Sequence, residues 1–326
     1  MKKRTKITLS VLCSFFAILF VAVMIYYFGD NYKTFYSLSK QSFAIPGLET
    51  KFVPQGLDHD QENQKFLVSG YMSNGEPSRI YVINQQSGKT EKFFTLTINE
   101  KAYTGHCGGI AVDGDYGFVV GDKEVIRFNY SSALALKNGE NLEIIDKFIP
   151  GNGADFVLIN SGKLIVGEFY KQGKYDTPTN HHIKISNNET NFALAYAYSI
   201  NQTKEFGIES QTPEYCISLP SQVQGMNFTK DGNIILSTSY SIPKSKLLIY
   251  ENVLNQSTEK TITLKEQEIP LYMLSSNTHL QTIEAPAMSE ELVLVDGKVY
   301  ILFESACSKY KLVNREQIKN VYALNV

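Results

Sequence analysis

The sequence contains no tryptophan, and its 326 residues include only four cysteines and five histidines. Three of the cysteines, Cys107, Cys216 and Cys307, are far apart, and no C-x-x-C pair occurs. This spacing gives neither a disulfide framework nor a cysteine-based zinc site and predicts buried free thiols. The net charge is −2, and Lys and Arg are spread singly along the chain. Without a basic stripe, no nucleic-acid partner is expected.

The N-terminus holds the one long apolar run. Residues 1–6, MKKRTK, are basic, and residues 7–28 form 22 positions without a charge, Gly or Pro. A helix of that length spans roughly 33 Å, close to the bilayer core. The run is too long for a signal-peptide core, and YYFGD offers no small-x-small cleavage site. The sequence therefore predicts a basic cytoplasmic tail (1–6), a retained transmembrane anchor (7–28), a stalk (29–39) and an extracytoplasmic domain (40–326) on a single-pass membrane protein.

Past residue 45 the sequence repeats one pattern five times. Each copy has a polar residue near small residues, an apolar strand, a turn and a second apolar strand; the copies are 54–71, 105–122, 153–170, 223–240 and 288–305. Four of the turns are two-residue hairpin signals, such as Asp113-Gly114 and Asp231-Gly232. A third strand follows each of the first four copies (78–84, 124–129, 193–200, 246–252), and a fourth precedes the next copy (91–98, 142–150, 213–220, 279–286). Four antiparallel strands per repeat are typical of an all-β fold, the β-propeller.

The chain ends favour closure of the ring. The last repeat has a third strand, NVYALNV, but no fourth, whereas the segment 40–46, KQSFAIP, precedes the first repeat without a partner. We expect this N-terminal strand to complete the last blade and remove a sheet edge. The prediction is a five-bladed propeller, with a six-bladed alternative if residues 253–275 form another blade.

One polar residue enters the first strand of each repeat. These residues are Gln55, His106, Asp155, Gln224 and Glu290. In a propeller this position faces the mouth of the central channel, on the face that carries the long loops, where function concentrates. Two readings stay open. The ring either closes the hole by internal hydrogen bonds and trapped water, or it binds a ligand or a cation. Oxygen ligands would suit Ca²⁺, whereas an imidazole favours Zn²⁺, with Asp155, His106 and Glu290 as the candidate metal ligands.

A second ring is expected at the ends of the second strands. It contains Tyr71, Glu168, Tyr240 and Glu304, together with Asp122. Asp155, Glu168, Glu290 and Glu304 are the candidate catalytic carboxylates, because paired carboxylates carry out glycoside hydrolysis. His181 and His182 lie in the longest loop over this face and are candidates for a lid. Tyr71, Tyr170 and Tyr240 would supply aromatic stacking at the rim.

The chain also resembles a known family, the uncharacterised exported or membrane-anchored bacterial β-propellers of about 300 residues. The matching stretches include FVPQGLD, YTGHCGGIAV, GADF, GEFY, QVQGMNFT and PAMSEELVLVDGKVYILFESACSKYK. They run from residue 52 to the end of the chain. The resemblance implies the fold and export, and no activity is attached to it. MSEELVLVDGKVY alone is similar to one blade of calcium-dependent apyrase-type nucleotidases, whose other signatures are missing.

These patterns lead to one expectation and two alternatives. We expect a membrane-anchored extracytoplasmic propeller whose funnel binds a small polar ligand, a glycan or a cell-envelope component. The first alternative is a cation-assisted hydrolase of the lactonase, glycosidase or phosphoester type that uses Asp155, His106 and Glu290. The second is a scaffold whose outer blade edges bind another envelope protein.

Overall fold

The computed structural model describes residues 11–21, 32–151 and 153–326. Residues 11–21 form an exposed helix inside the predicted anchor. The predicted tail, the rest of the anchor and the first part of the stalk lie outside the described residues. In the part that is described, no helix has both the length and the apolar character needed to cross a membrane. A short helix, α2 (Lys33–Leu38), leads directly into the first strand.

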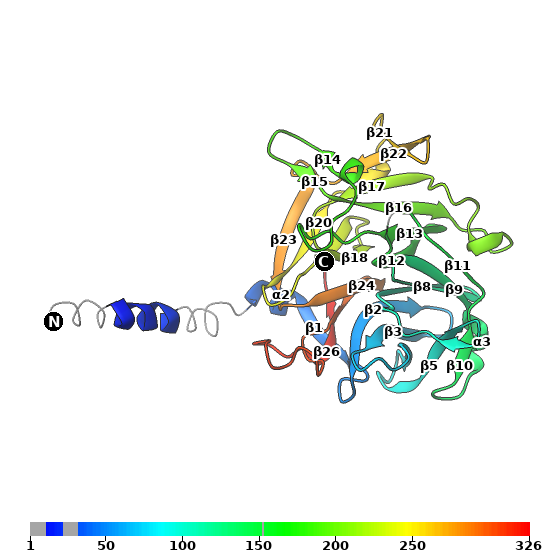
Figure 1. The fold of residues 1–326 in the computed structure, drawn as a ribbon, viewed down its shortest axis with the longest axis horizontal. Coiled ribbons are helices and arrows are strands. Elements are labelled where there is room, and N and C mark those ends of the chain that lie inside the picture. The colour runs from blue at the N-terminus through cyan, green and yellow to red at the C-terminus, as the bar shows by residue number, and fades with distance from the viewer. Residues whose placement is uncertain (1–10, 22–31, 152) are drawn as a thin grey trace.

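Five antiparallel blades surround one axis, which confirms the predicted fold (Figure 1). The inner strands are β2 (Phe52–Asp60), β7 (Gly109–Asp113), β12 (Phe156–Asn160), β18 (Val223–Phe228) and β24 (Ser289–Val295). The second strands are β3 (Lys65–Met72), β8 (Tyr116–Gly121), β13 (Lys163–Gly167), β19 (Ile234–Thr238) and β25 (Lys298–Phe303). The third strands are β4 (Arg79–Asn84), β9 (Glu124–Asn129), β16 (Ala193–Ser199), β20 (Ser245–Tyr250) and β26 (Asn320–Leu324). The fourth are β5 (Thr90–Ile98), β11 (Asp146–Phe148), β17 (Tyr215–Leu219), β23 (His279–Ala285) and β1 (Ser39–Ala44).

The remaining elements decorate the outer edges and the loops. β21 (Thr261–Leu264) and β22 (Gln267–Met273) form a hairpin that adds to the third blade, with β22 parallel to β17. The six-bladed alternative is therefore wrong, because residues 253–275 extend an existing sheet. The predicted strand 142–150 is divided: β10 (Asn141–Glu143) joins the first blade and only β11 joins the second. The others are β6 (Lys101–Ala102), β14 (Ile183–Lys184), β15 (Thr190–Asn191), α3 (Tyr130–Ala135), η1 (Thr179–His181), η2 (Glu205–Gly207) and η3 (Val253–Asn255).

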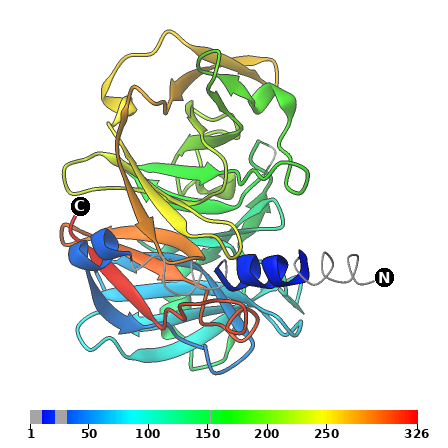
Figure 2. The ribbon, with the colours of Figure 1, turned by 90° about the vertical axis from the view of Figure 1, so that its left-hand side faces the viewer.

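The N-terminal strand closes the ring as predicted. β1 pairs antiparallel with β26, with Ser39 opposite Leu324 and Ala44 opposite Asn320. Figure 2 shows this seam as a blue strand beside a red one. Both ends of the propeller thus belong to the fifth blade, and its outer edge is built from the start of the fold.

Most blade strands are apolar and buried on both faces. β4, β8 and β13 are buried at almost every position, because each blade packs between two neighbours. The inner strands also contact one another around the whole ring, from β2 through β7, β12, β18 and β24 back to β2. Close approach at the axis requires small residues. A Cβ on Gly225 would lie 2.7 Å from the Cα of Glu291, and one on Gly109 would lie 2.8 Å from its Oε1.

A single carboxylate ties four of the blades together at the axis. The Oε2 atom of Glu291 on β24 accepts hydrogen bonds from the backbone N–H of Leu57 (2.9 Å) and of Ile110 (3.1 Å). Its Oε1 atom accepts from the N–H of Val157 at 3.1 Å. The side chain is buried, and burial raises its pKa, an effect that the three N–H donors oppose. Glu291 therefore closes the axis and joins the fifth blade to the first, second and third.

Replacing Glu291 should be among the most destabilising single changes in this chain. Glu291→Ala leaves three buried N–H groups without an acceptor, which should lower the free energy of unfolding by at least about 3 kcal/mol. Urea unfolding of the full-length protein in detergent measures this change. Glu284→Gln alters an exposed glutamate on β23 and should stay within about 0.5 kcal/mol of the wild type. Equal stability of the two variants would show that Glu291 does not hold the blades together.

Candidate functional site

The predicted ring residues lie where the inner strands begin, and three of them owe their position to irregular pairing. Between Pro54 and Gly56 the pairing of β2 with β3 shifts by one residue, which leaves Gln55 without an opposite partner. The same shift occurs around Gln224 on β18 and between Ser289 and Leu292 on β24. A β-bulge of this kind re-aims a side chain. On β24 it lets the adjacent residues Glu290 and Glu291 both point into the protein, where each is at most 3% exposed.

Glu290 and Glu304 form a carboxyl pair at this mouth. The two side chains hydrogen-bond to each other, so one of them carries a proton that the pair shares. Gln55 Nε2 donates to Glu304 Oε2 at 2.9 Å and to the carbonyl of Pro54 at 2.8 Å. Burial raises the pKa of Glu304 to about 7, against the opposing effect of Lys309, and it raises that of Glu290 well above its usual range. No N–H or hydroxyl group among the described residues donates to the buried Oε1 atom of Glu290, so the proton shared with Glu304 is the one hydrogen available to it.

Tyr71 lies beside this pair, His106 and Lys309 contact Tyr71, and all three residues reach solvent. The rings of Tyr71 and His106 are in contact, with 4.8 Å between their centroids. Lys309 Nζ donates to the hydroxyl of Tyr71 at 2.6 Å. Burial lowers the pKa of His106; solvent reaches the ring and weakens that effect, and His106 is neutral at pH 7 in either case. We call the six residues Gln55, Tyr71, His106, Glu290, Glu304 and Lys309 the axial cluster.

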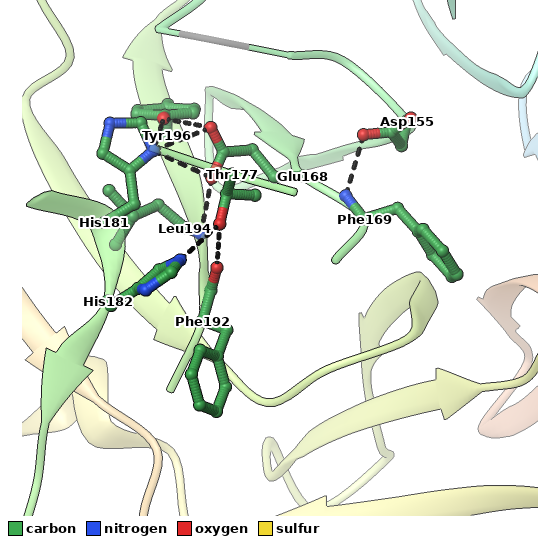
Figure 3. Close-up of polar contacts among 9 residues, drawn as sticks. All are labelled: Asp155, Glu168, Phe169, Thr177, His181, His182, Phe192, Leu194 and Tyr196. Carbon is green, nitrogen blue, oxygen red and sulfur yellow. Dashed lines mark hydrogen bonds and ion pairs between the residues drawn. The ribbon is translucent and has the colours of Figure 1, made fainter. Parts of the chain in front are cut away.

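Glu168 belongs to a separate, buried network (Figure 3). His181 Nδ1 lies 3.0 and 3.1 Å from its two carboxylate oxygens, and the Tyr196 hydroxyl donates to Oε1 at 2.7 Å. The N–H of Leu194 donates to Oε2 at 3.0 Å. Because a carboxylate only accepts, Nδ1 carries the ring proton of His181. The longest loop is therefore fastened to the blade through η1, and His181, only 4% exposed, is an internal residue rather than an open lid.

Asp155 lies apart from that network. Figure 3 shows its carboxylate bonded to the next strand end, where the N–H of Phe169 donates to Oδ2 at 2.8 Å. Burial raises its pKa to about 6, while the side chain remains exposed. Water screens most of that effect, so Asp155 is ionised at neutral pH. Across the described residues, no three His, Cys, Asp or Glu side chains gather closely enough to hold a metal ion. The predicted set of Asp155, His106 and Glu290 is thus not brought together.

The remaining predicted residues line other parts of the same face. Tyr170 is only 7% exposed because it stacks on Phe192, with 4.8 Å between the centroids. The two rings form one wall of a cavity of about 240 Å³, whose other lining residues are Lys171, Gln172, Ser221 and Gln222. His182 packs edge-on against both rings and contacts Thr177 at 3.2 Å.

Tyr240 accepts a hydrogen bond from Lys174 at 2.9 Å. Gln224 is half-buried and takes part in none of these contacts.

Sequence reasoning missed two residues that matter here, Glu291 and Lys309. Glu291 had a signal: a second acidic residue directly follows Glu290 at the start of an otherwise apolar strand, and glycines stand at the matching points of other blades. Lys309 had none, since it is one basic residue in a polar loop. Its place depends on the path of residues 306–319, which brings Lys309 to Tyr71 on the first blade.

No family model and no curated protein matches the chain. Solved structures that resemble it include a glutaminyl cyclase from Myxococcus xanthus (8% identity, TM-score 0.46, 88% of this chain and 93% of that one). Others are a PQQ-bound aldose sugar dehydrogenase from Streptomyces coelicolor (11%, 0.49, 87% and 96%) and a putative glucose dehydrogenase from Thermus thermophilus (12%, 0.45, 88% and 99%). At these identities and TM-scores, nothing about the site follows from the likeness.

Burial of Glu304 makes stability depend on pH. The folded chain holds the Glu304 proton more tightly than the unfolded chain, so the stability that this proton adds is complete below pH 4.5 and is lost as the pH rises through about 7. Glu304→Gln should flatten the fall in unfolding free energy between pH 4.5 and 8 by roughly 1–3 kcal/mol. Asp58, whose pKa burial raises to about 7, gives a slope of the same sign that the variant keeps. Denaturant unfolding across this pH range, with the exposed Glu62→Gln as control, provides the measurement. An unchanged slope contradicts the raised pKa of Glu304.

The two acidic residues of Figure 3 should behave differently when removed. Glu168→Ala deprives the Nδ1–H of His181, the Tyr196 hydroxyl and the Leu194 N–H of their acceptor, and we expect a loss of about 3 kcal/mol. Asp155→Ala removes an exposed carboxylate with one hydrogen bond and should cost less than about 1 kcal/mol. Urea unfolding of both variants compares them directly. A tolerated Glu168→Ala would mean that the network does not fasten the loop.

Proposed function

We propose that the protein is a membrane-anchored, extracytoplasmic propeller that binds a small polar ligand, a glycan or a cell-envelope component at the axial cluster. The support for the anchor is the uncharged run 7–28 behind the basic residues 1–6, which keeps the N-terminus cytoplasmic. The support for binding is the chemistry of the cluster. It combines acceptors, donors and an aromatic ring on the loop-bearing face of a rigid scaffold.

One observation carries this proposal: among the described residues no N–H or hydroxyl group donates to the buried Oε1 atom of Glu290, so it has no donor beyond the proton shared with Glu304. Buried polar atoms are nearly always satisfied, and leaving one unpaired costs about 1–3 kcal/mol. The neighbouring donor, Gln55 Nε2, is already engaged by Glu304 and Pro54. A ligand with a hydroxyl or amino group would supply the missing donor, while His106 and Tyr71 contact the rest of it.

A hydrolase is the second candidate, and the carboxyl pair favours it. A general acid works best when its pKa lies near the operating pH, and the pKa of Glu304 is raised to about 7. Glu290 or Glu304 would donate the proton, and the neutral ring of His106 would act as base. Asp155, His106 and Glu290 do not gather around one point. The hydrolase that fits the structure therefore uses the Glu290–Glu304 pair in place of that set.

Binding should depend on the axial cluster and not on the cavity beside Tyr170. A glycan array followed by calorimetry on the full-length protein in detergent should find a neutral or charged saccharide whose affinity falls at least about tenfold in Glu290→Gln and in His106→Ala. Gln172→Ala, in the separate cavity beside Tyr170, is the matched control and should bind as the wild type does. Equal affinity in all four proteins would place the ligand elsewhere and contradict the proposal.

A further inference from the structure

The cavity beside Tyr170 lies between the third and fourth blades, apart from the axial cluster. Its volume is about 240 Å³, and the stacked rings of Tyr170 and Phe192 form one wall. The N–H of Gln222 donates to the carbonyl of Tyr170 at 3.0 Å, which joins the segment after β13 to the segment before β18. The axial cluster uses residues of the fifth, first and second blades. The cavity and the cluster therefore belong to different parts of the ring.

The lining of this cavity combines an apolar wall with polar side chains. Lys171, Gln172, Ser221 and Gln222 complete the lining, and no carboxylate is among the lining residues. A pyranose has apolar C–H faces and polar hydroxyls, so it matches an aromatic wall beside a few amide and hydroxyl groups. Sites for drug-sized molecules have volumes of roughly 300–1,000 Å³. This smaller cavity suits a single sugar unit.

Gln222 is held in an unusual backbone conformation at the cavity. Its φ is 67°, in the left-handed region that residues other than glycine rarely adopt. Its N–H bonds to Tyr170, and its own carbonyl accepts a hydrogen bond from the N–H of Ser239 at 2.9 Å. Such conformations persist where the surroundings enforce them, and they concentrate at ligand-binding sites. The backbone at Gln222 therefore favours a binding role for this cavity.

Two lysines gather beside the cavity, around the ring of Tyr240, the residue after Ser239. Lys171 Nζ lies 5.2 Å from the centroid of this ring, and Lys174 Nζ lies 5.4 Å from it. The two ammonium groups are therefore no farther apart than these two distances combined. Lys174 Nζ also donates to the Tyr240 hydroxyl at 2.9 Å, while Lys171 is itself part of the cavity lining.

No carboxylate of the described residues forms an ion pair with either of these lysines. Asp176, on the same loop, accepts a hydrogen bond from the N–H of Gly173 at 2.9 Å. The nearby Asp155 accepts one from the N–H of Phe169. Both carboxylates thus bond to backbone groups. Two ammonium groups near one ring repel each other, and an anion beside them would be attracted by both.

We propose that this cavity is a second binding site and that its ligand is an acidic sugar unit. The pyranose ring lies against the wall formed by Tyr170 and Phe192, and Gln222 bonds to its hydroxyls. Lys171 holds the anionic group, and Lys174 adds to the positive potential there. This site is additional to the binding function proposed for the axial cluster.

The test compares three sugars that share one pyranose ring: glucose, glucuronate with a carboxylate at carbon 6, and glucose 6-phosphate with a phosphate there. Calorimetry at low salt on the full-length protein in detergent would use the wild type, Lys171→Met and Phe192→Leu. The wild type should bind at least one of the two anions about tenfold more tightly than glucose, and the tighter one identifies the acidic group. Lys171→Met should remove this preference, because it removes the ammonium in the lining. Phe192→Leu should weaken the binding of all three sugars, since the ring wall serves each of them.

Lys230→Met is the matched control, because it removes an exposed lysine from the turn between β18 and β19. This variant should bind as the wild type does, and circular dichroism confirms that each variant is folded. Three outcomes overturn the inference. The first is equal affinity of the wild type for all three sugars, absence of binding included. The second is an unchanged preference for the anion in Lys171→Met. The third is a loss of anion binding in Glu290→Gln and not in Lys171→Met, which would place the acidic sugar at the axial cluster.

Discussion

The structure depends on one carboxylate at the axis. A propeller brings several inner strands so close together that few side chains fit between them, and the backbone N–H groups there cannot reach water. Glu291 meets both constraints. Its two carboxylate oxygens accept hydrogen bonds from backbone N–H groups of the first three blades, and its Cα packs against Gly225 of the fourth blade, where no side chain intervenes. Because this side chain closes the axis, the space open to a ligand is confined to the mouth above it. The neighbouring residue, Glu290, faces that mouth.

The architecture could be predicted from the sequence because its signals are local and repeated. Period-two apolar strands, tight turns such as Asp231-Gly232 and an unpaired segment at each chain end led to five blades and to the closure by β1. Part of the ring of polar residues could be predicted for the same reason. Aligning the repeats places Gln55 and Glu290 near Glu304, where they make contact. The alignment does not predict the β-bulges at Gln55 and Glu290.

The rest of the site could not be predicted because it depends on bulges and loops. Strict alternation would send Glu290 and Glu291 to opposite faces, whereas the shifted register of β24 buries both. Glu168 was expected in an open funnel because nothing in the sequence shows that the loop 171–192 folds down and brings His181 onto it. The position of Lys309 likewise depends on the path of the loop 306–319. The observed site is consequently asymmetric. Residues of the fifth, first and second blades form the axial cluster, whereas Glu168 of the third blade binds the loop 171–192.

The closure of the ring also has a consequence for the order in which the protein can fold. β1 and β26 lie at opposite ends of the fold in sequence, and the fifth blade needs both. During synthesis β1 emerges first, and its partner becomes available only after the other four blades have been made. Until then β1 is an unpaired edge. The backbone N–H groups of Leu57, Ile110 and Val157 also lack their acceptor, because Glu291 belongs to the last blade. Folding of the complete ring is therefore a late, long-range event, and the nascent chain is most exposed to aggregation just before its last blade arrives.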